Sequence, residues 1–377
     1  MTRKERLGNI ICGKEADRPA VCFYELNGID QNPDNPDEFN VYNDPSWKEL
    51  LEMTRDRTDR IVLRYASTEN RSNLMESVCK ETILPNGNIK YDYTLELAGR
   101  TFTASSMRGK DVDTVWYTEC LFKDSDDLEH FMSIPYEWKK PIPYTNHVFE
   151  ADKLLGDAGI VGIDVSSPLC ELAGLFDMAD YLVVAMTEQS LFHSALERIA
   201  ERRLAEIEAF SAAVPGRLWR IYGPEYAAAP FLPPNLFEEY VVRYDKPIVE
   251  AIKRNGGFPR IHSHGNLRGI IDHIAEIGYT GIDPIEPPGQ GDMTLAEVRE
   301  RLGKNVVLFG NIELSEIETL EENDFRRRVR GALNDGCLSG GRGMVLMPSA
   351  CPIGRVLKPR TVNNYKIMIE ETEKWVC

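Results

Sequence analysis

Residues 258–312 read FPRIHSHGNLRGIIDHIAEIGYTGIDPIEPPGQGDMTLAEVRERLGKNVVLFGNI, and the pattern of this segment indicates the fold class. Short apolar segments alternate in it with longer amphipathic ones, which is the pattern of strands separated by helices. The expected strands are FPRIH (258–262), YTGID (279–283) and NVVLFG (305–310), and the expected helices cover 267–277 and 294–302. Strands and helices in strict alternation indicate a parallel sheet with right-handed crossovers.

The same alternation continues on both sides of this stretch. Further strands are expected at 60–65, 158–165, 218–222 and 343–347, and further helices at 2–12, 46–57, 187–213, 234–255, 323–335 and 361–375. These patterns make seven strands, and an eighth is expected within 112–118 or 141–147. We therefore predict an α/β fold, a (β/α)8 TIM barrel with an N-terminal extension. Because no G-x-G-x-x-G follows an expected strand, a dinucleotide-binding sheet has no support.

Residues 82–122 break this rhythm. The sequence ILPNGNIKYDYTLELAGRTFTASSM contains an Asn-Gly turn, a run of alternating residues and a second turn with glycine. Those are signals of β hairpins. We predict a small antiparallel β meander, inserted into a single barrel domain that spans 1–377. A short acidic helix is expected to follow over 124–132, with Asp124 or Ser125 as its N-cap.

The composition excludes several classes of protein. The 377 residues carry a formal charge of −16, whereas a nucleic-acid-binding surface needs a basic face. No run of 18 apolar residues occurs, so we expect no membrane span. The first residues show no secretory signal, and the eight cysteines form no C-x-x-C pair. We therefore expect reduced thiols and a cytoplasmic protein.

Polar residues follow the expected strands, where a barrel carries its chemistry. His262 and His264 lie two positions apart, and in extended backbone such side chains point to the same side. Cys351 follows the last strand in the run VLMPSAC. Two imidazoles and one thiolate can form a three-ligand zinc site with an open fourth position, the layout of a catalytic metal centre.

Each of these residues also has a plainer interpretation. A histidine at the end of a strand is often a hydrogen-bonded rim residue, and an isolated cysteine is often a small buried apolar residue. We consider Glu225 and Glu286 as the candidate catalytic residues. Glu225 can complete the metal shell, act on the substrate, or be a rim carboxylate. Glu286 can orient a metal-bound imidazole as a hydrogen-bond acceptor, or lie on the surface of a loop.

The C-terminal half resembles the uroporphyrinogen decarboxylase superfamily, whose members are (β/α)8 barrels. The resemblance is clearest over about 155–375. It rests on HSHGN (262–266), IGYTGIDPIEP, MTLAEVRERLG, LFGNI and VLMPSACPIG.

The superfamily contains two main chemistries. True uroporphyrinogen decarboxylases are metal-free and use an arginine-rich N-terminal motif, which the corresponding RPAVCFYELNGID lacks. The corrinoid-dependent methyltransferases, including methylcobamide:coenzyme M methyltransferases, typically bind zinc through His-x-Cys after one strand and a Cys after the last strand. His262 and Cys351 match two of these ligands, and His264 stands at the place of the third. In that branch a Glu near the middle of the chain can complete the zinc shell, and Glu225 matches it best.

The resemblance implies a zinc-dependent methyltransferase that moves a methyl group between a small methylated substrate and the cobalt of a corrinoid. An aryl methyl ether is one candidate substrate, which would make the reaction an O-demethylation. Because the chain lacks an Asp-x-His-x-x-Gly cobalamin motif, the corrinoid (cobalamin) is expected on a separate partner protein that docks over the barrel mouth. The oligomeric state stays open, with a homodimer among the options.

Aromatic residues near the mouth are candidates for holding an aromatic ring, although packing of the loops explains each of them equally well. They are Phe23, Tyr24, Tyr222, Tyr226 and Phe231. Two other functions stay open. One is a metal-free decarboxylase related to uroporphyrinogen decarboxylase, and the other is a non-enzymatic barrel that binds a tetrapyrrole or a protein.

Overall fold

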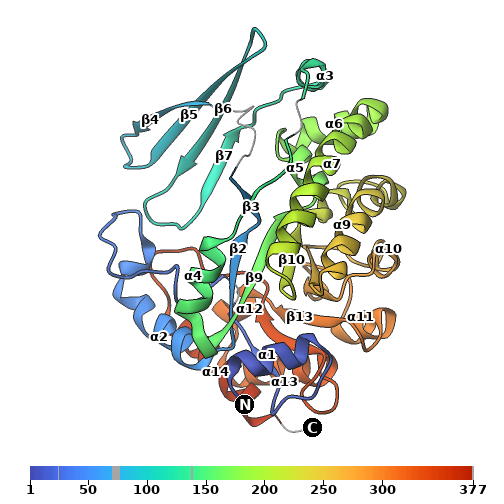
Figure 1. Ribbon diagram of the computed structural model, residues 1–377. Coiled ribbons are helices and arrows are strands. Elements are labelled where there is room, and N and C mark those ends of the chain that lie inside the picture. Colours follow the sequence, from blue (N-terminus) through green and yellow to red (C-terminus); the bar gives the residue numbers. More distant parts are fainter. Residues whose placement is uncertain (24, 70–76, 137–138, 376–377) are drawn as a thin grey trace.

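The barrel is formed by eight parallel strands in a computed structural model that describes residues 1–23, 25–69, 77–136 and 139–375. The strands follow one another in the order β1-β14-β13-β12-β11-β10-β9-β2, and the sheet curls round with helices outside it (Figure 1). Their bounds are β1 Ala20–Val21, β2 Arg60–Tyr65, β9 Gly159–Ser166, β10 Leu218–Tyr222, β11 Phe258–Ser263, β12 Gly281–Pro284, β13 Val307–Ile312 and β14 Met344–Pro348. The predicted (β/α)8 fold is confirmed.

The two ends of this sheet are joined at Asp59, just before β2. The Asp59 backbone N–H donates to the Val21 carbonyl over 2.7 Å, and the Val21 N–H donates to Asp59 Oδ2 over 3.0 Å. Asp59 is fully buried and also forms ion pairs with Arg6 and Arg18. Through its backbone N–H and its buried carboxylate, Asp59 therefore connects β1 to the start of β2 and closes the ring of strands.

The prediction for the eighth strand was wrong. Residues 115–119 form β7 of a separate antiparallel sheet, and Pro143–Tyr144 (β8) pairs antiparallel with Ser67–Thr68 (β3). The eighth barrel strand is β1, in the segment predicted to be an N-terminal extension. A strand of two residues has no measurable alternation. VWYTE at 115–119 has the β-branched and aromatic residues typical of a strand, but it is almost entirely exposed and lies outside the barrel.

The helices lie mainly where the alternation predicts them. Their bounds are α1 Arg3–Ile11, α2 Lys48–Arg57, α3 Ser125–Ser133, α4 Asn146–Leu155, α5 Pro168–Ala173, α6 Met178–Thr187, α7 Gln189–Ala213, α8 Pro234–Phe237, α9 Arg243–Arg254, α10 Ile271–Ile277, α11 Leu295–Leu302, α12 Leu314–Thr319, α13 Glu322–Gly336 and α14 Pro359–Lys374. Of the helices in the described ranges, none combines the length and the apolar character that crossing a membrane requires.

The inside of the barrel changes character along its axis. Near the amino ends of the strands the interior is apolar, and α1 closes it because Leu7 and Ile10 pack against residues such as Leu218 and Val345. Further along, the inward positions are charged, with Arg220 on β10 and Arg260 on β11 in register with each other. Burying such groups is tolerated when each has a partner, so this level of the barrel must be an ordered ionic network.

The insertion is a four-stranded antiparallel meander that stands over the end of the barrel from which β2 leads into β3 (Figure 1). Its strands are β4 Val78–Ile83, β5 Ile89–Leu97, β6 Arg100–Arg108 and β7 Val115–Glu119, so the predicted meander is present and begins at Val78. Asp124 caps α3 by accepting a hydrogen bond from the Asp127 N–H. The link between β6 and β7 bridges to the loop after β14, where the Asp113 N–H donates to the Ile353 carbonyl over 2.7 Å.

A buried carboxylate on α9 should make stability depend on pH. Asp245 is fully buried and accepts hydrogen bonds from Ser167 Oγ (2.9 Å) and the Tyr279 hydroxyl (2.8 Å). Burial raises its pKa to about 7, although both hydrogen bonds act in the opposite direction. Between about pH 4 and 7 the folded protein therefore holds a proton that the unfolded chain has lost, so this group lowers stability as the pH rises.

We expect Asp245→Asn to remove that dependence, because asparagine keeps the shape and carries no charge. Wild type should lose up to roughly 1.4 kcal/mol of unfolding free energy per pH unit from this group between about pH 4 and 7, and the variant should not. Urea unfolding of both proteins at pH 5, 6, 7 and 8 measures the difference. Parallel curves for the two proteins would contradict the assignment.

Candidate functional site

Two imidazoles lie side by side at the carboxyl end of β11. The ring centroids of His262 and His264 are 4.7 Å apart, and the ring planes are nearly perpendicular. His262 is buried and lies in register with Tyr222 on β10 and with Asp283 on β12. The two rings therefore lie side by side at the barrel mouth, between residues of the neighbouring strands β10 and β12.

Asp283 holds the first imidazole. His262 Nδ1 lies 2.7 Å from Asp283 Oδ2, while Asp283 Oδ1 lies 3.0 Å from Arg260 Nε on the other side. Burial alone would raise the pKa of Asp283, but the charges of Arg260 and His262 and the His262 hydrogen bond keep it below its ordinary value. An ionised carboxylate on Nδ1 fixes the tautomer and the orientation of the ring. Nε2 is then the nitrogen that can contact a metal ion or a substrate.

Glu286 holds the second imidazole. His264 Nδ1 lies 2.7 Å from Glu286 Oε1, and the Gly265 N–H donates to Glu286 Oε2. Burial opposes ionisation of both side chains. Their hydrogen bond and mutual charge nevertheless raise the pKa of His264 and lower that of Glu286. Glu286 thus makes the contacts of an acceptor that orients an imidazole, which was one of its two interpretations from the sequence.

Glu225 approaches the histidines from the loop after β10. Its Oε2 is inaccessible to solvent and has no hydrogen-bond partner within the described ranges. Burial raises its pKa, and the nearby charges of His262 and His264 oppose that shift. The turn into Glu225 requires Gly223, whose φ is +91° and where a Cβ would lie 2.2 Å from the Cβ of Cys170.

Cys351 lies apart from this group. Its Sγ donates to Glu25 Oε2 over 3.6 Å, and Glu25 Oε1 in turn lies 3.8 Å from Arg220 Nη1. Burial and the charge of Glu25 both raise the pKa of the thiol. In the part of the chain that the structure describes, no three side chains of His, Cys, Asp or Glu converge into a group that could hold a metal. The structure thus sets His262 beside His264 and Glu286 on His264, with Glu225 within electrostatic reach of both histidines, and it places Cys351 against Glu25.

Sequence reasoning missed two carboxylates of the mouth. Asp283 was recognised only as the end of the strand YTGID, although its register with His262 places it beside the imidazole. Glu313 follows β13 directly, and its Oε1 is buried without a hydrogen-bond partner among the described residues. Burial and the charge of Glu286 raise the pKa of Glu313. Both follow from one signal, an acidic residue at or just after the carboxyl end of a strand.

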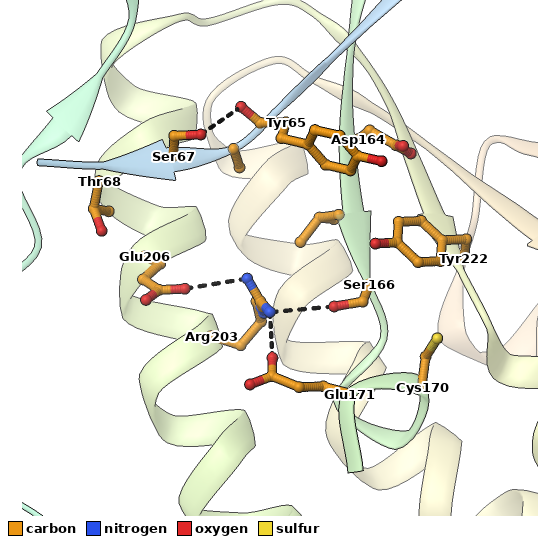
Figure 2. Close-up of a pocket in the computed structure, with 12 residues that line it drawn as sticks. Tyr65, Ser67, Thr68, Asp164, Ser166, Cys170, Glu171, Arg203, Glu206 and Tyr222 are labelled. Atoms are coloured by element: carbon orange, nitrogen blue, oxygen red, sulfur yellow. Dashed lines mark hydrogen bonds and ion pairs between the residues drawn. The ribbon is translucent and has the colours of Figure 1, made fainter. Parts of the chain in front are cut away.

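A cavity of about 620 Å³ opens at the carboxyl ends of β2, β9 and β10 (Figure 2). Tyr222, which lies in register with His262, forms part of its wall. The cavity is therefore next to the histidine pair in the same mouth. Its lining comprises Tyr65, Ala66, Ser67, Thr68, Asp164, Val165, Ser166, Cys170, Glu171, Arg203, Glu206 and Tyr222.

Fold and site together define a (β/α)8-barrel protein with a carboxylate-supported histidine pair at the carboxyl ends of its strands. The chain belongs to the uroporphyrinogen decarboxylase family, because the family model described as Uroporphyrinogen decarboxylase (URO-D) matches residues 146–375. The family resemblance predicted from the sequence is thereby confirmed. No curated protein sequence matches the chain.

Among solved structures, a methyltransferase from Methanosarcina mazei is similar over 99% of both chains, with a TM-score of 0.61 and 16% identity. This likeness shows that the fold is shared along the whole chain. Two weaker likenesses carry no weight at their TM-scores. They are a putative fructose-1,6-biphosphate aldolase from Coccidioides immitis (0.29, 11% identity, 61% of this chain and 78% of that one) and a GH5 xyloglucanase from Bacteroides ovatus (0.31, 10% identity, 83% and 98%).

Removing the carboxylate charge beside His262 should lower the stability of the folded protein. We expect Asp283→Asn to destabilise the protein by about 3–5 kcal/mol, because it leaves Arg260 buried without its carboxylate. A matched control is Asp272→Asn, which breaks an exposed ion pair with Arg301 and should leave stability unchanged within experimental scatter. Urea unfolding of the three proteins measures this. Equal unfolding free energies of the two variants would show that Asp283 does not stabilise the buried Arg260.

Proposed function

We propose that this protein is a zinc-dependent methyltransferase that exchanges a methyl group between a small methylated substrate and the cobalt of a corrinoid. The observation that carries the proposal is the pair of imidazoles at the barrel mouth, each with a carboxylate on Nδ1. Histidines that bind metals are commonly oriented in this way. The likeness to a methyltransferase along the whole chain supports the same choice.

His262, His264 and Cys351 would hold the zinc ion, with Glu225 as the fourth ligand at rest. The donors fit zinc in kind, since imidazole nitrogen, thiolate and carboxylate are its usual ligands. The buried Oε2 of Glu225 has no hydrogen-bond partner in the described ranges, as expected of an oxygen reserved for a ligand. The Cys351 thiol donates a hydrogen bond to Glu25, so metal binding requires the thiol to give up this hydrogen bond and lose its proton.

When bound, zinc supplies a Lewis acid next to the heteroatom that loses its methyl group. The residues of the chain prepare this place. Asp283 and Glu286 fix the orientation of the imidazoles, and Arg260 keeps Asp283 ionised. Such prior ordering avoids reorganisation during the reaction. If the donor is an ether, the corrinoid would supply the electron pair for the new bond to the methyl carbon, and the ether oxygen would leave with the pair of the broken methyl–oxygen bond.

The corrinoid would be carried by a separate protein that docks over the mouth, close to the meander. An aryl methyl ether is the substrate that we favour, and the reaction is then an O-demethylation in the cytoplasm. The same site can run in reverse, towards a methyl acceptor. Formation of a homodimer is compatible with this arrangement.

A metal-free decarboxylase is the second candidate. One observation favours it: within the described ranges, the potential metal ligands do not gather into a group of three. The family is also named for a decarboxylase. On this alternative the carboxylate-supported histidines would serve acid–base chemistry, and Cys351 would be dispensable.

Zinc content decides between the two candidates. We expect freshly purified protein to contain about one zinc ion per chain, and His264→Ala and Cys351→Ser to lose most of it. Cys12→Ser, which changes an exposed cysteine of the surface, is the matched control and should keep the metal. Metal analysis and circular dichroism of all four proteins are the measurements. Wild type that stays free of metal after zinc is supplied would overturn the zinc mechanism and favour the decarboxylase.

A further inference from the structure

Arg60, the first residue of β2, is a buried arginine without a carboxylate partner. Five arginines are buried among the residues that the structure describes, and four of these form ion pairs: Arg6, Arg203, Arg220 and Arg260. Arg60 is only 5% exposed, yet no described carboxylate forms an ion pair with it. Proteins seldom bury a charge without a counter-charge. The place of Arg60 therefore calls for a negative charge that the described residues do not supply.

Most of the Arg60 guanidinium is also without a hydrogen-bond partner. Its Nε donates to the Asn27 carbonyl. Nη1 and Nη2 make no hydrogen bond with a described residue, and neither nitrogen is fully shielded from solvent. The paired N–H groups of these two nitrogens are the planar fork with which arginine binds an oxyanion. Arg60 thus presents an unused fork at the bottom of a site that solvent reaches.

Two further arginines lie beside Arg60. A Cβ on Gly28 would lie 3.4 Å from Arg60 Nη2 and 3.4 Å from the Cβ of Arg55, so Gly28 is packed against both side chains. Arg3 of α1 donates through Nη1 to the Arg55 carbonyl over 2.7 Å and to the Thr58 carbonyl over 3.0 Å. Burial lowers the pKa of Arg60, and the charges of Arg3 and Arg55 lower it further. Arg60 is therefore close enough to both arginines to be repelled by them.

The charge of this group is positive, although the whole chain carries −16. Asp56 is bound by Arg55 through two hydrogen bonds of 2.8 and 2.9 Å. Arg3 forms no ion pair in the described part of the chain, and its nearest negative neighbour, Asp59, is already paired with two other arginines. The last carbonyls of α2, which Arg3 caps, offer only a partial negative charge. Arg3, Arg55 and Arg60 therefore share one full counter-charge and leave an excess of positive charge.

We propose that Arg3, Arg55 and Arg60 form an anion site that binds a phosphate group, either free or as a monoester. Guanidinium groups bind phosphate oxygens in pairs, and a doubly charged anion would balance the positive excess. The site lies at the amino end of β2, whereas the histidine pair lies at the carboxyl end of β11. It is separate from the proposed methyl transfer, and an anion there would fasten α1, α2 and the loop at Asn27 to one another.

Calorimetric titration of the full-length protein at pH 7.5 tests the site. Inorganic phosphate supplies the free ion, and glycerol 3-phosphate supplies the same group on an organic molecule. Sodium chloride keeps the ionic strength constant, so that screening does not change during the titration. We expect saturable binding with a Kd of roughly 1 mM, and the probe that binds more tightly identifies the source of the phosphate group. Absence of saturable binding for both probes overturns the proposal.

Variants locate the binding. Arg60→Met removes the charge and keeps an apolar stem, so it should weaken phosphate binding about tenfold or more. Because this variant also loses a buried charge that lacks a partner, it should be at least as stable as wild type without phosphate. Arg3→Gln changes a partly exposed residue and should weaken binding about fivefold. Arg57→Gln, which breaks an ion pair with Glu373 on the same helix, is the matched control and should bind as wild type does.

Unchanged phosphate affinity in both Arg60→Met and Arg3→Gln overturns the site, and Arg3→Gln decides alone if Arg60→Met does not fold. Phosphate can also bind a metal ion in the mouth, so the titration is repeated with His264→Ala. We expect unchanged affinity in that variant, because His264 lies at the other end of the barrel. Binding that is lost in His264→Ala and kept in Arg60→Met belongs to the mouth and overturns the proposal.

Discussion

The mouth of this barrel depends on one buried carboxylate, Asp283. Its side chain is shielded from water and lies between the guanidinium of Arg260 and the imidazole of His262. The parallel register of β11 and β12 makes this contact, because it sets Asp283 opposite His262. An ionised group here is tolerable only with both partners in place. The same carboxylate therefore stabilises the charged layer of the barrel and sets the orientation of His262.

That layer also separates two functions of the interior. Below it, α1 and the amino ends of the strands form an apolar plug that supplies stability. Above it, four carboxylates from the carboxyl ends of β10, β12 and β13 lie near the histidines; they are Glu225, Asp283, Glu286 and Glu313. The division follows the general behaviour of such barrels, in which chemistry belongs to the carboxyl ends of the strands. It also explains why the imidazoles can be fixed before any ligand arrives.

Periodicity in the sequence was enough to predict seven strands and the meander, because each is encoded in runs of at least four residues. The family was predicted from motifs such as HSHGN (262–266). Periodicity failed for β1, whose two residues carry no period and which is held by hydrogen bonds to Asp59. In the site, the i, i+2 spacing of the histidines and the position of Glu286 were readable. Two contacts could not be predicted from spacing, because they depend on how distant segments fold together. They are the hydrogen bond between Cys351 and Glu25 and the ion pair between Asp283 and Arg260.

Arg355, four residues after Cys351, binds several segments that are remote in sequence. Its guanidinium donates to the carbonyls of Glu38, Asn40 and Lys110 and to the side chains of Asn43 and Asp111. Its own carbonyl accepts a hydrogen bond from the indole of Trp47. The N-terminal loop, the base of the meander and the loop after β14 thus form a single clamp. A rim tied in this way has little configurational entropy left to lose, so a molecule arriving on that side meets a surface already set in its bound form.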